Sequence, residues 1–323
     1  MPKFRLPGLP TSTCDSPVEI ADFWEIETLI ASSKKASLNN LRATLHRETE
    51  SDPATDAELD IEEESQLDFA IDEIRYRIAT CGPTRYPFGF SGESDRVLIY
   101  KADRPEQMRL LYIFLLLVTR MNMNIRRTFN DVDGPLLFEE VCEAALKGVW
   151  SNRTKTHRFG TSSGQGNFPN KLKSFFDDLE EFPLRSDREI PNHGGDDGLD
   201  IAVWTSFTWA PSEQSNAPRG KLILLAQCKT GTSWEVADLQ RLQPDSFFGK
   251  WMAPEPCGQT VRAFLASARV DRNKWEDHHR DGGLIFDRCR IFDYTAENLP
   301  ESVFSKVRIW TEAALECSDL GIR

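Results

Sequence analysis

The sequence predicts an α/β protein in which a mixed sheet is flanked by helices and preceded by an N-terminal, mostly helical (α+β) domain. Helical spacing of apolar residues dominates the first part of the chain, whereas strand-like and helix-like segments alternate in the second. The segment Asn130–Pro135 separates the two parts, because its Asn, Asp, Gly and Pro residues favour turns. We therefore expect an N-terminal domain over residues 1–130 and a second domain over residues 131–323.

In the N-terminal domain, residues 1–16 predict an irregular arm. Apolar residues then recur at helical spacing in four segments: 21–31, 37–46, 66–79 and 106–121. The acidic stretch 48–64 contains Pro53 and predicts a flexible loop. Residues 88–100 predict a hairpin that turns at Ser91–Gly92. Helices followed by a hairpin are also the order of a winged-helix DNA-binding module, although any small α+β domain can have it.

The second domain begins with a helix from Gly134, which is followed by a basic, glycine-containing loop. Helical patterns follow at 170–181, 234–243, 273–280 and 302–317. Residues typical of strands fill four segments: 199–209, 221–228, 261–270 and 284–294. Because strands alternate with helices, we expect a mixed sheet with helices on its faces.

Composition narrows the class of protein. A hydrophobic fraction of 40% and a charged fraction of 28% are typical of a soluble globular protein. The longest apolar run, 110–118, is too short for a membrane span, which needs about 20 residues, and the prolines near residue 1 do not resemble a signal peptide. The 7 cysteines are scattered without a Cys-x-x-Cys pair, which argues against disulfides and structural zinc. We expect a cytoplasmic protein without a membrane partner.

The charges are unevenly distributed. The net charge of −12 argues against a general nucleic-acid binder, but residues 48–73 contain many acidic and no basic side chains. Residues 151–173 show the opposite bias, because they contain no acidic residue and several basic ones: Arg153, Lys155, Arg158, Lys171 and Lys173. Both runs are compatible with ordinary solvated surfaces. Alternatively, the basic run contacts a phosphate backbone and the acidic run is a linker or a partner site.

Polar side chains stand at the ends of two neighbouring strands. If the segments around 199–209 and 221–228 form a hairpin that folds near Gln214, Asp200 lies opposite Lys229, about 5 Å away. Gln227 precedes Lys229 by two residues, so both share one face of the strand. Each residue also has an ordinary interpretation: Asp200 can cap the turn at Gly198, and Lys229 can extend to solvent at a strand end.

This combination is typical of a divalent-metal phosphodiesterase site. Mg²⁺ prefers oxygen ligands, commonly one or two carboxylates together with water and a substrate phosphate. A bound divalent metal lowers the pKa of water and neutralises charge that develops on the phosphate. An adjacent lysine can orient the attacking water and stabilise the phosphate in the transition state.

The chain resembles the PD-(D/E)XK nuclease superfamily, which has the restriction-endonuclease-like fold. The matching elements are Gly198-Leu-Asp200 with the following Ile-Ala-Val, the Gln227-Cys-Lys229 motif of the Mrr-like subgroup, and the preceding Phe-Glu helix over 137–146. The resemblance covers residues 134–295. It implies Mg²⁺ (or Mn²⁺) bound by Glu139, Asp200 and Gln227, with Lys229 beside the attacking water. Glu140 is the alternative to Glu139, and Gln227 replaces the acidic residue found in most of the superfamily.

The resemblance implies an endonuclease that hydrolyses DNA, as the effector of a prokaryotic anti-phage defence system. The basic residues between Arg153 and Lys173 would hold the DNA backbone. The N-terminal half would bind DNA or a protein partner, such as an ATPase, a helicase or a regulatory subunit, and the chain could form a homo-oligomer. Two alternatives stay open: an RNase, and a catalytically inactive scaffold or sensor that binds nucleic acid or a protein.

Overall fold

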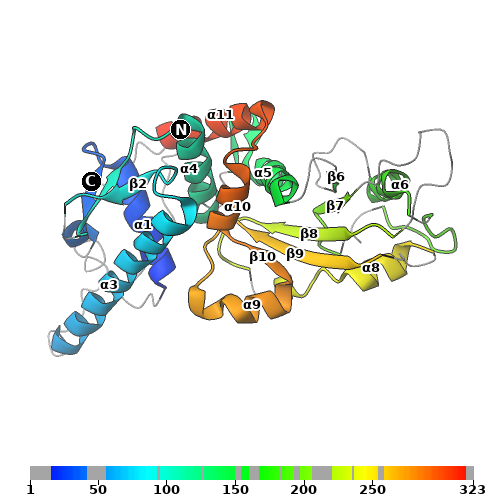
Figure 1. Ribbon diagram of the computed structural model, residues 1–323, viewed down its shortest axis with the longest axis horizontal. Helices are drawn as coiled ribbons and strands as arrows, with labels where there is room; N and C mark the ends of the chain where they lie inside the picture. Colours follow the sequence, from blue (N-terminus) through cyan, green and yellow to red (C-terminus); the bar gives the residue numbers. More distant parts are fainter. Residues whose placement is uncertain are drawn as a thin grey trace.

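The computed structural model describes residues 16–41, 56–92, 95–121, 123–124, 127–149, 154–159, 167–181, 183–192, 197–205, 220–234, 236–253 and 258–317. In these residues the protein is elongated, with the N-terminal helices at one end and the five-stranded sheet toward the other (Figure 1). The architecture is mixed α/β, as the sequence predicts.

The N-terminal half combines helices with a small sheet. Its long helices are α1 (Pro17–Ile30), α3 (Asp56–Cys81) and α4 (Glu106–Arg120). Its antiparallel sheet has the order β1-β3-β2 and consists of β1 (Lys35–Ser37), β2 (Phe88–Phe90) and β3 (Val97–Tyr100). Every residue of α4 from Leu110 to Arg120 is buried, which agrees with a sequence that is apolar nearly all round the helix.

One prediction for this half is wrong. The acidic segment 48–64 was expected to be a loop, but α3 already begins at Asp56 and includes the rest of that segment. The segment is rich in Glu, which has high helix propensity, and acidic residues are favoured near the positive N-terminal end of a helix. The outcome at residues 48–55 lies outside the described residues.

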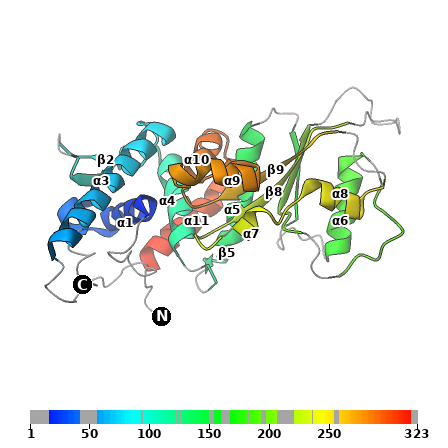
Figure 2. The ribbon, with the colours of Figure 1, turned by 90° about the horizontal axis from the view of Figure 1, so that it is seen from below.

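The larger sheet has the order β10-β9-β8-β7-β6. Its strands are β6 (Thr154–Arg158), β7 (Ile201–Thr205), β8 (Ile223–Lys229), β9 (Thr260–Ala266) and β10 (Leu284–Phe286). β6, β7 and β8 pair antiparallel, whereas β8, β9 and β10 pair parallel, so the sheet is mixed. Helix α5 (Gly134–Val149) lies on one side of the sheet, and α6 (Phe168–Leu179) and α8 (Pro244–Trp251) lie on the other (Figure 2).

Two further predictions need correction. The segment 151–173 was expected to be a loop before its helix, yet residues 154–158 form the edge strand β6 beside β7. The segment 284–294 was expected to be one strand, but it divides into β10 and the helix α10 (Arg288–Thr295). The Asp287 side chain accepts a hydrogen bond from the Arg290 backbone N–H and so caps the first turn of α10.

The remaining elements complete the second half. They are the short β4 (Thr128–Phe129) and β5 (Val132–Asp133), α7 (Val236–Leu239), the 3₁₀ turn η1 (Arg272–Lys274), α9 (Trp275–Gly282) and α11 (Glu301–Cys317). The helix predicted over 234–243 is therefore much shorter, whereas the closing helix agrees with its prediction. Within the described residues, no helix is long and apolar enough to cross a membrane.

One hydrophobic core extends across the boundary expected at residue 130. It contains Trp24, Ile74 and Tyr112 from the first half together with Phe292 and Trp310 from the second. A second core lies between the sheet and helices α6 and α8 and includes Phe175 and Phe247. Independent folding of the two expected domains stays a prediction, but the shared core gives them extensive contact.

A buried ion-pair network also joins the two halves. Asp22 on α1 lies 2.7 Å from Arg77 on α3, 2.7 Å from Arg120 on α4 and 2.6 Å from Arg288 on α10. Further ion pairs extend the network to its full set of members: Asp22, Glu25, Glu73, Arg77, Arg120, Arg269, Asp287 and Arg288. All of these side chains are buried. Buried charges of this kind need partners, because removal from water is costly for each ion.

Candidate active site

The β7–β8 pair brings the motif residues to one end of the sheet, but not in the expected register. Ile201 pairs with Ala226, so the prediction that Asp200 lies opposite Lys229 is wrong. The Asp200 backbone N–H also donates to the Ala226 carbonyl at 3.0 Å, so Asp200 and Ile201 both lie beside Ala226. Two residues beside one residue of the partner strand is the arrangement of a β-bulge, which interrupts the regular ladder.

Gln227 and Lys229 share one face of β8 because side chains alternate along a strand. The alternation along β7 is interrupted at Asp200, so the register alone does not assign its side chain to that face. One carboxylate oxygen of Asp200 also accepts a hydrogen bond from the Cys228 backbone N–H at 2.7 Å, which fixes the side chain against β8.

A strained turn delivers Asp200 to this position. Asp197 and Gly198 both have positive φ, 51° and 85°. A Cβ at position 198 would lie 3.2 Å from the Arg241 side chain and 3.3 Å from the Gln227 side chain. Glycine is suited to this position because it adopts positive φ readily and leaves room for close neighbours. The sequence Gly198-Leu-Asp200 thus folds as the tight entry to β7.

Glu139 approaches from helix α5 on the opposite side of the sheet. Burial, followed by the negative charge of Asp200, raises the pKa of Glu139 to about 8, despite the opposing influence of Arg158 and Lys171. One helical turn later, the Cys142 thiol is hydrogen-bonded to the Cys228 thiol, which holds α5 against β8. Glu139 and Asp200 are thus close enough for their charges to interact.

The neighbouring glutamates of α5 have other partners. Glu140 accepts hydrogen bonds from Lys306 at 2.8 Å and Arg158 at 3.3 Å. Glu143 pairs with Lys147 at 2.7 Å and with Arg158 at 2.9 Å. Between the two alternatives that the sequence left open, the geometry favours Glu139, because its charge lies beside Asp200 and that of Glu140 is already neutralised.

The oxygen atoms of this cluster fit a hard divalent cation. Glu139 Oε2 and Gln227 Oε1 are fully buried, and neither has a hydrogen-bond partner among the described residues. Buried polar atoms are nearly always paired with protein groups or ordered water, so two acceptors without a protein partner leave room for water, a proton on Glu139 or a cation. Carboxylate and amide oxygens are suitable ligands for Mg²⁺ or Mn²⁺. The described residues contain no group of three or more His, Cys, Asp and Glu side chains around one point, and this set has only two carboxylates.

Lys229 forms an ion pair that the sequence did not predict. Its ammonium lies 2.9 Å from a carboxylate oxygen of Asp238 on α7, and both side chains are about a third exposed. Asp238 stands outside every motif in the sequence, and it meets Lys229 only because α7 folds back beside the end of β8. The ammonium is therefore held at the edge of the oxygen cluster by a second carboxylate.

The basic segment has a mixed outcome. Lys155 and Lys173 are exposed, as expected for residues that contact a ligand from solvent. Arg158 is engaged with Glu140 and Glu143, and Lys171 is buried, with its ammonium donating to the Phe159 carbonyl at 2.9 Å. These contacts give Arg158 and Lys171 structural roles in the described fold. Arg153 lies outside the described residues.

Sequence reasoning missed two basic residues that lie beside the turn at Asp197 and Gly198. Arg241 and Lys250 line a cavity of about 290 Å³ together with Asp197 and Gln243. Lys250 also pairs with Asp197 at 3.0 Å, and Arg241 packs on Gly198 beside Gln227. Both residues are isolated in the sequence, so no local run of charge pointed to them.

The chain was compared with family models, with curated proteins and with solved structures. None of the three comparisons found a match.

Proposed function

We propose that the protein is a metal-dependent endonuclease of the restriction-endonuclease-like type that hydrolyses DNA phosphodiester bonds. The observation that carries the proposal is the pair of buried, unpaired oxygen atoms on Glu139 and Gln227 beside the Asp200 carboxylate. Buried acceptors without a protein donor are places where a water molecule or a cation can be bound. The mixed sheet with helices on both sides is compatible with this fold type.

In this proposal Glu139, Asp200 and Gln227 hold Mg²⁺ or Mn²⁺. When bound, the metal lowers the pKa of a water molecule and neutralises charge on the phosphate. Glu139 must lose its proton to act as a ligand, and the cation supplies the positive charge that it lacks. The Asp200 carboxylate is already oriented by the Cys228 N–H, so little rearrangement is required of it.

Lys229 has the second role. Its ammonium lies two residues beyond Gln227 on the same face of β8, where it can orient the attacking water and donate to a phosphate oxygen. The Asp238 carboxylate restricts the ammonium in the described state. Arg241 and Lys250 would contact the phosphate groups beside the bond that is cut, because their cavity adjoins the Gly198 turn.

The direct test is cleavage of supercoiled plasmid DNA by the purified protein with Mg²⁺ or Mn²⁺, with EDTA as the metal-free control. Asp200→Ala and Lys229→Ala should each reduce the rate by about a hundredfold or more, the usual effect of losing a group that acts on the reacting atoms. Lys306→Ala is the matched lysine control, because its partner is Glu140 at 2.8 Å, and it should cleave like the wild type.

Other results identify the alternatives. Cleavage of RNA but not of DNA of the same sequence would make the protein an RNase. Absence of metal-dependent cleavage for both polymers would instead favour an inactive scaffold or sensor. Wild-type cleavage that survives Asp200→Ala would exclude this cluster as the active site. The wider role, an anti-phage effector with a partner protein, rests on the sequence resemblance alone.

A further inference from the structure

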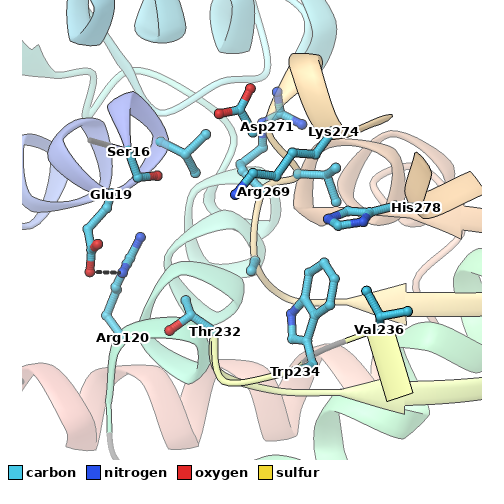
Figure 3. Close-up of a pocket in the computed structure, with 13 residues that line it drawn as sticks. Ser16, Glu19, Arg120, Thr232, Trp234, Val236, Arg269, Asp271, Lys274 and His278 are labelled. Atoms are coloured by element: carbon cyan, nitrogen blue, oxygen red, sulfur yellow. Dashed lines mark hydrogen bonds and ion pairs between the residues drawn. The ribbon is translucent and has the colours of Figure 1, made fainter. Parts of the chain in front are cut away.

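A second cavity of about 510 Å³ lies between the two halves of the protein, and the loop that follows Lys229 forms part of its wall. α1 and the end of α4 contribute Glu19 and Arg120 to one side of it, whereas Trp234 and His278 lie beside each other on the other side (Figure 3). The cavity stands beyond the carboxyl ends of β8 and β9, which run parallel. Crevices at the carboxyl ends of parallel strands are common ligand sites, and the volume is in the range of small-molecule pockets.

The charged residues that line the cavity have a positive excess, because three are basic (Arg120, Arg269 and Lys274) and two are acidic (Glu19 and Asp271). Glu19 pairs with Arg120 at 2.7 Å, whereas the Asp271 side chain accepts from the Asn273 backbone N–H at 2.9 Å, a hydrogen bond that does not neutralise a charge. Lys274 lines the same cavity, is exposed, and has no ion pair within the described part of the chain. An anion is therefore the complementary ligand.

Unpaired donors point to the same chemistry. Trp234 Nε1 is buried, and Arg269 Nη2 is buried on a side chain that is only 5% exposed. Neither donor has an acceptor among the residues that the structure describes. A ligand rich in acceptor oxygens or nitrogens would satisfy both. The Trp234 ring packs edge-on against His278 with ring centroids 5.1 Å apart, which supplies an aromatic surface for a flat ring.

The cavity is connected to the candidate active site through a short stretch of chain. Thr232, Trp234 and Val236 line the cavity, and Lys229 and Asp238, which form the 2.9 Å ion pair, flank these residues in sequence. The Gly231 backbone N–H donates to the Val118 carbonyl of α4, so the same stretch is tied to the N-terminal half. A ligand that packs against Trp234 and Val236 would contact the segment that carries Asp238.

We propose that this cavity binds a nucleotide, with the phosphate near Lys274 and the base against Trp234 and His278, and that binding alters the Lys229–Asp238 ion pair. The ligand has two sources with the same chemistry: a free nucleotide, or a terminal nucleotide of a nucleic-acid strand. The effect on Lys229 rests on the proposed nuclease function, whereas binding in the cavity does not.

Binding is tested on the full-length Asp200→Ala variant by calorimetric titration with AMP and, separately, with a single-stranded DNA dodecamer. At least one probe should bind. Lys274→Glu should weaken that binding by about tenfold or more, which corresponds to about 1.4 kcal/mol. Lys274 is exposed, so its replacement leaves the core intact. Arg280→Glu is the matched control, because this exposed α9 residue pairs with Asp277 and does not line the cavity, and it should bind like the parent.

The outcomes separate the parts of the proposal. Binding of AMP identifies a free nucleotide as sufficient, whereas binding of the dodecamer alone identifies the strand as the source. Binding of neither probe, or binding that Lys274→Glu leaves unchanged, overturns the site. In the wild type, a saturating amount of the probe that binds should change the plasmid cleavage rate by about fivefold, and Asp238→Asn should remove the difference. A cleavage rate that does not change when the probe binds overturns the proposed coupling. Binding of the probe by a protein that shows no cleavage overturns only the proposed nuclease function.

Discussion

The buried ion-pair network and the candidate active site both remove carboxylates from water, but the charges around Asp22 and around Glu139 differ. Burial alone would raise the pKa of Asp22, yet Arg288, Arg120 and Arg77 together hold it well below its usual range. Burial raises the pKa of Glu139, and the nearby Asp200 adds to this effect, so that the pKa reaches about 8. The same physical cost thus has opposite results at two carboxyl groups of one molecule.

The difference between the two pKa shifts distinguishes a cluster of ion pairs from a site that can accept a ligand. Where several opposite charges surround one buried carboxylate, as at Asp22, the ion pairs hold helices together. Where a buried carboxyl lacks a close counter-charge, the fold maintains a state that a cation or a proton must complete.

The largest effect is expected from Asp22→Ala. The substitution leaves Arg77, Arg120 and Arg288 without a shared partner, and it should reduce the free energy of unfolding by about 3–5 kcal/mol. Asp72→Ala removes an exposed ion pair with Arg75 at 3.0 Å and should cost about 1 kcal/mol or less. Urea unfolding monitored by circular dichroism measures both. Equal losses for the two variants would show that the network is not essential for joining the halves.

At the candidate site, removal of a buried carboxyl group is expected to increase the free energy of unfolding instead of reducing it. Because the pKa of Glu139 is raised in the folded state, from its ordinary 4.5 to about 8, the metal-free protein should lose stability as pH rises between these values and level off above them. Glu139→Gln should remove this contribution and make the metal-free protein more stable than the wild type at pH 8, on the order of a few kcal/mol. Unfolding curves of both proteins at pH 5 and pH 8 provide the measurement. If the difference in the free energy of unfolding between wild type and variant is the same at both pH values, the raised pKa is refuted.

Metal addition gives the complementary result. Mg²⁺ should stabilise the wild type more at pH 9 than at pH 6, because Glu139 binds it only after losing its proton. With the metal at a hundredfold excess over its dissociation constant, the gain is about 2.7 kcal/mol. Thermal unfolding with Mg²⁺ and with EDTA tests this, and Glu140→Gln should respond to metal like the wild type because Glu140 pairs with Lys306. Loss of the response in Glu140→Gln would exchange the roles of the two glutamates.

The smallest effect concerns DNA binding. Arg241→Ala should weaken binding by about 1 kcal/mol and reduce the slope of log affinity against log salt by about 1, as for one lost phosphate contact. Lys173→Ala in the basic segment is the comparison, since that residue is exposed on α6. Fluorescence anisotropy at several salt concentrations measures both slopes. A larger change for Lys173→Ala would indicate that DNA contacts the basic segment 151–173, as the sequence first suggested.

Local patterns predicted much of the fold. Apolar spacing located α1, α4, α5, α6 and α11, and residues typical of strands located β7, β8 and β9. Register was beyond these patterns, because the pairing of β7 with β8 is shifted from a hairpin centred near Gln214, so Ile201 lies opposite Ala226 and Asp200 does not lie opposite Lys229. The helix α10 was missed because a single capping residue, Asp287, ended a pattern that otherwise read as a strand.

The candidate site was predictable in its motifs but not in its environment. Asp200, Gln227 and Lys229 follow from short sequence patterns, and the structure brings them to the same end of the β7–β8 pair. The partners that distinguish Glu139 from Glu140 come from Lys306 and Arg158, which are remote in sequence. The ion pair between Lys229 and Asp238 and the cavity around Arg241 depend on how α7 and the Gly198 turn pack, which no local pattern encodes.

The ion pair between Asp22 and Arg288 spans 266 positions of the chain. During synthesis, the N-terminal helix leaves the ribosome long before its last arginine partner exists. Until residue 288 emerges, Asp22 and Glu25 have no complete set of counter-charges, and the core that α10 closes stays open. A nascent chain that stops short of this helix would therefore lack part of the core against which α5 and its Glu139 pack, so the candidate site would assemble only after residue 288 has emerged.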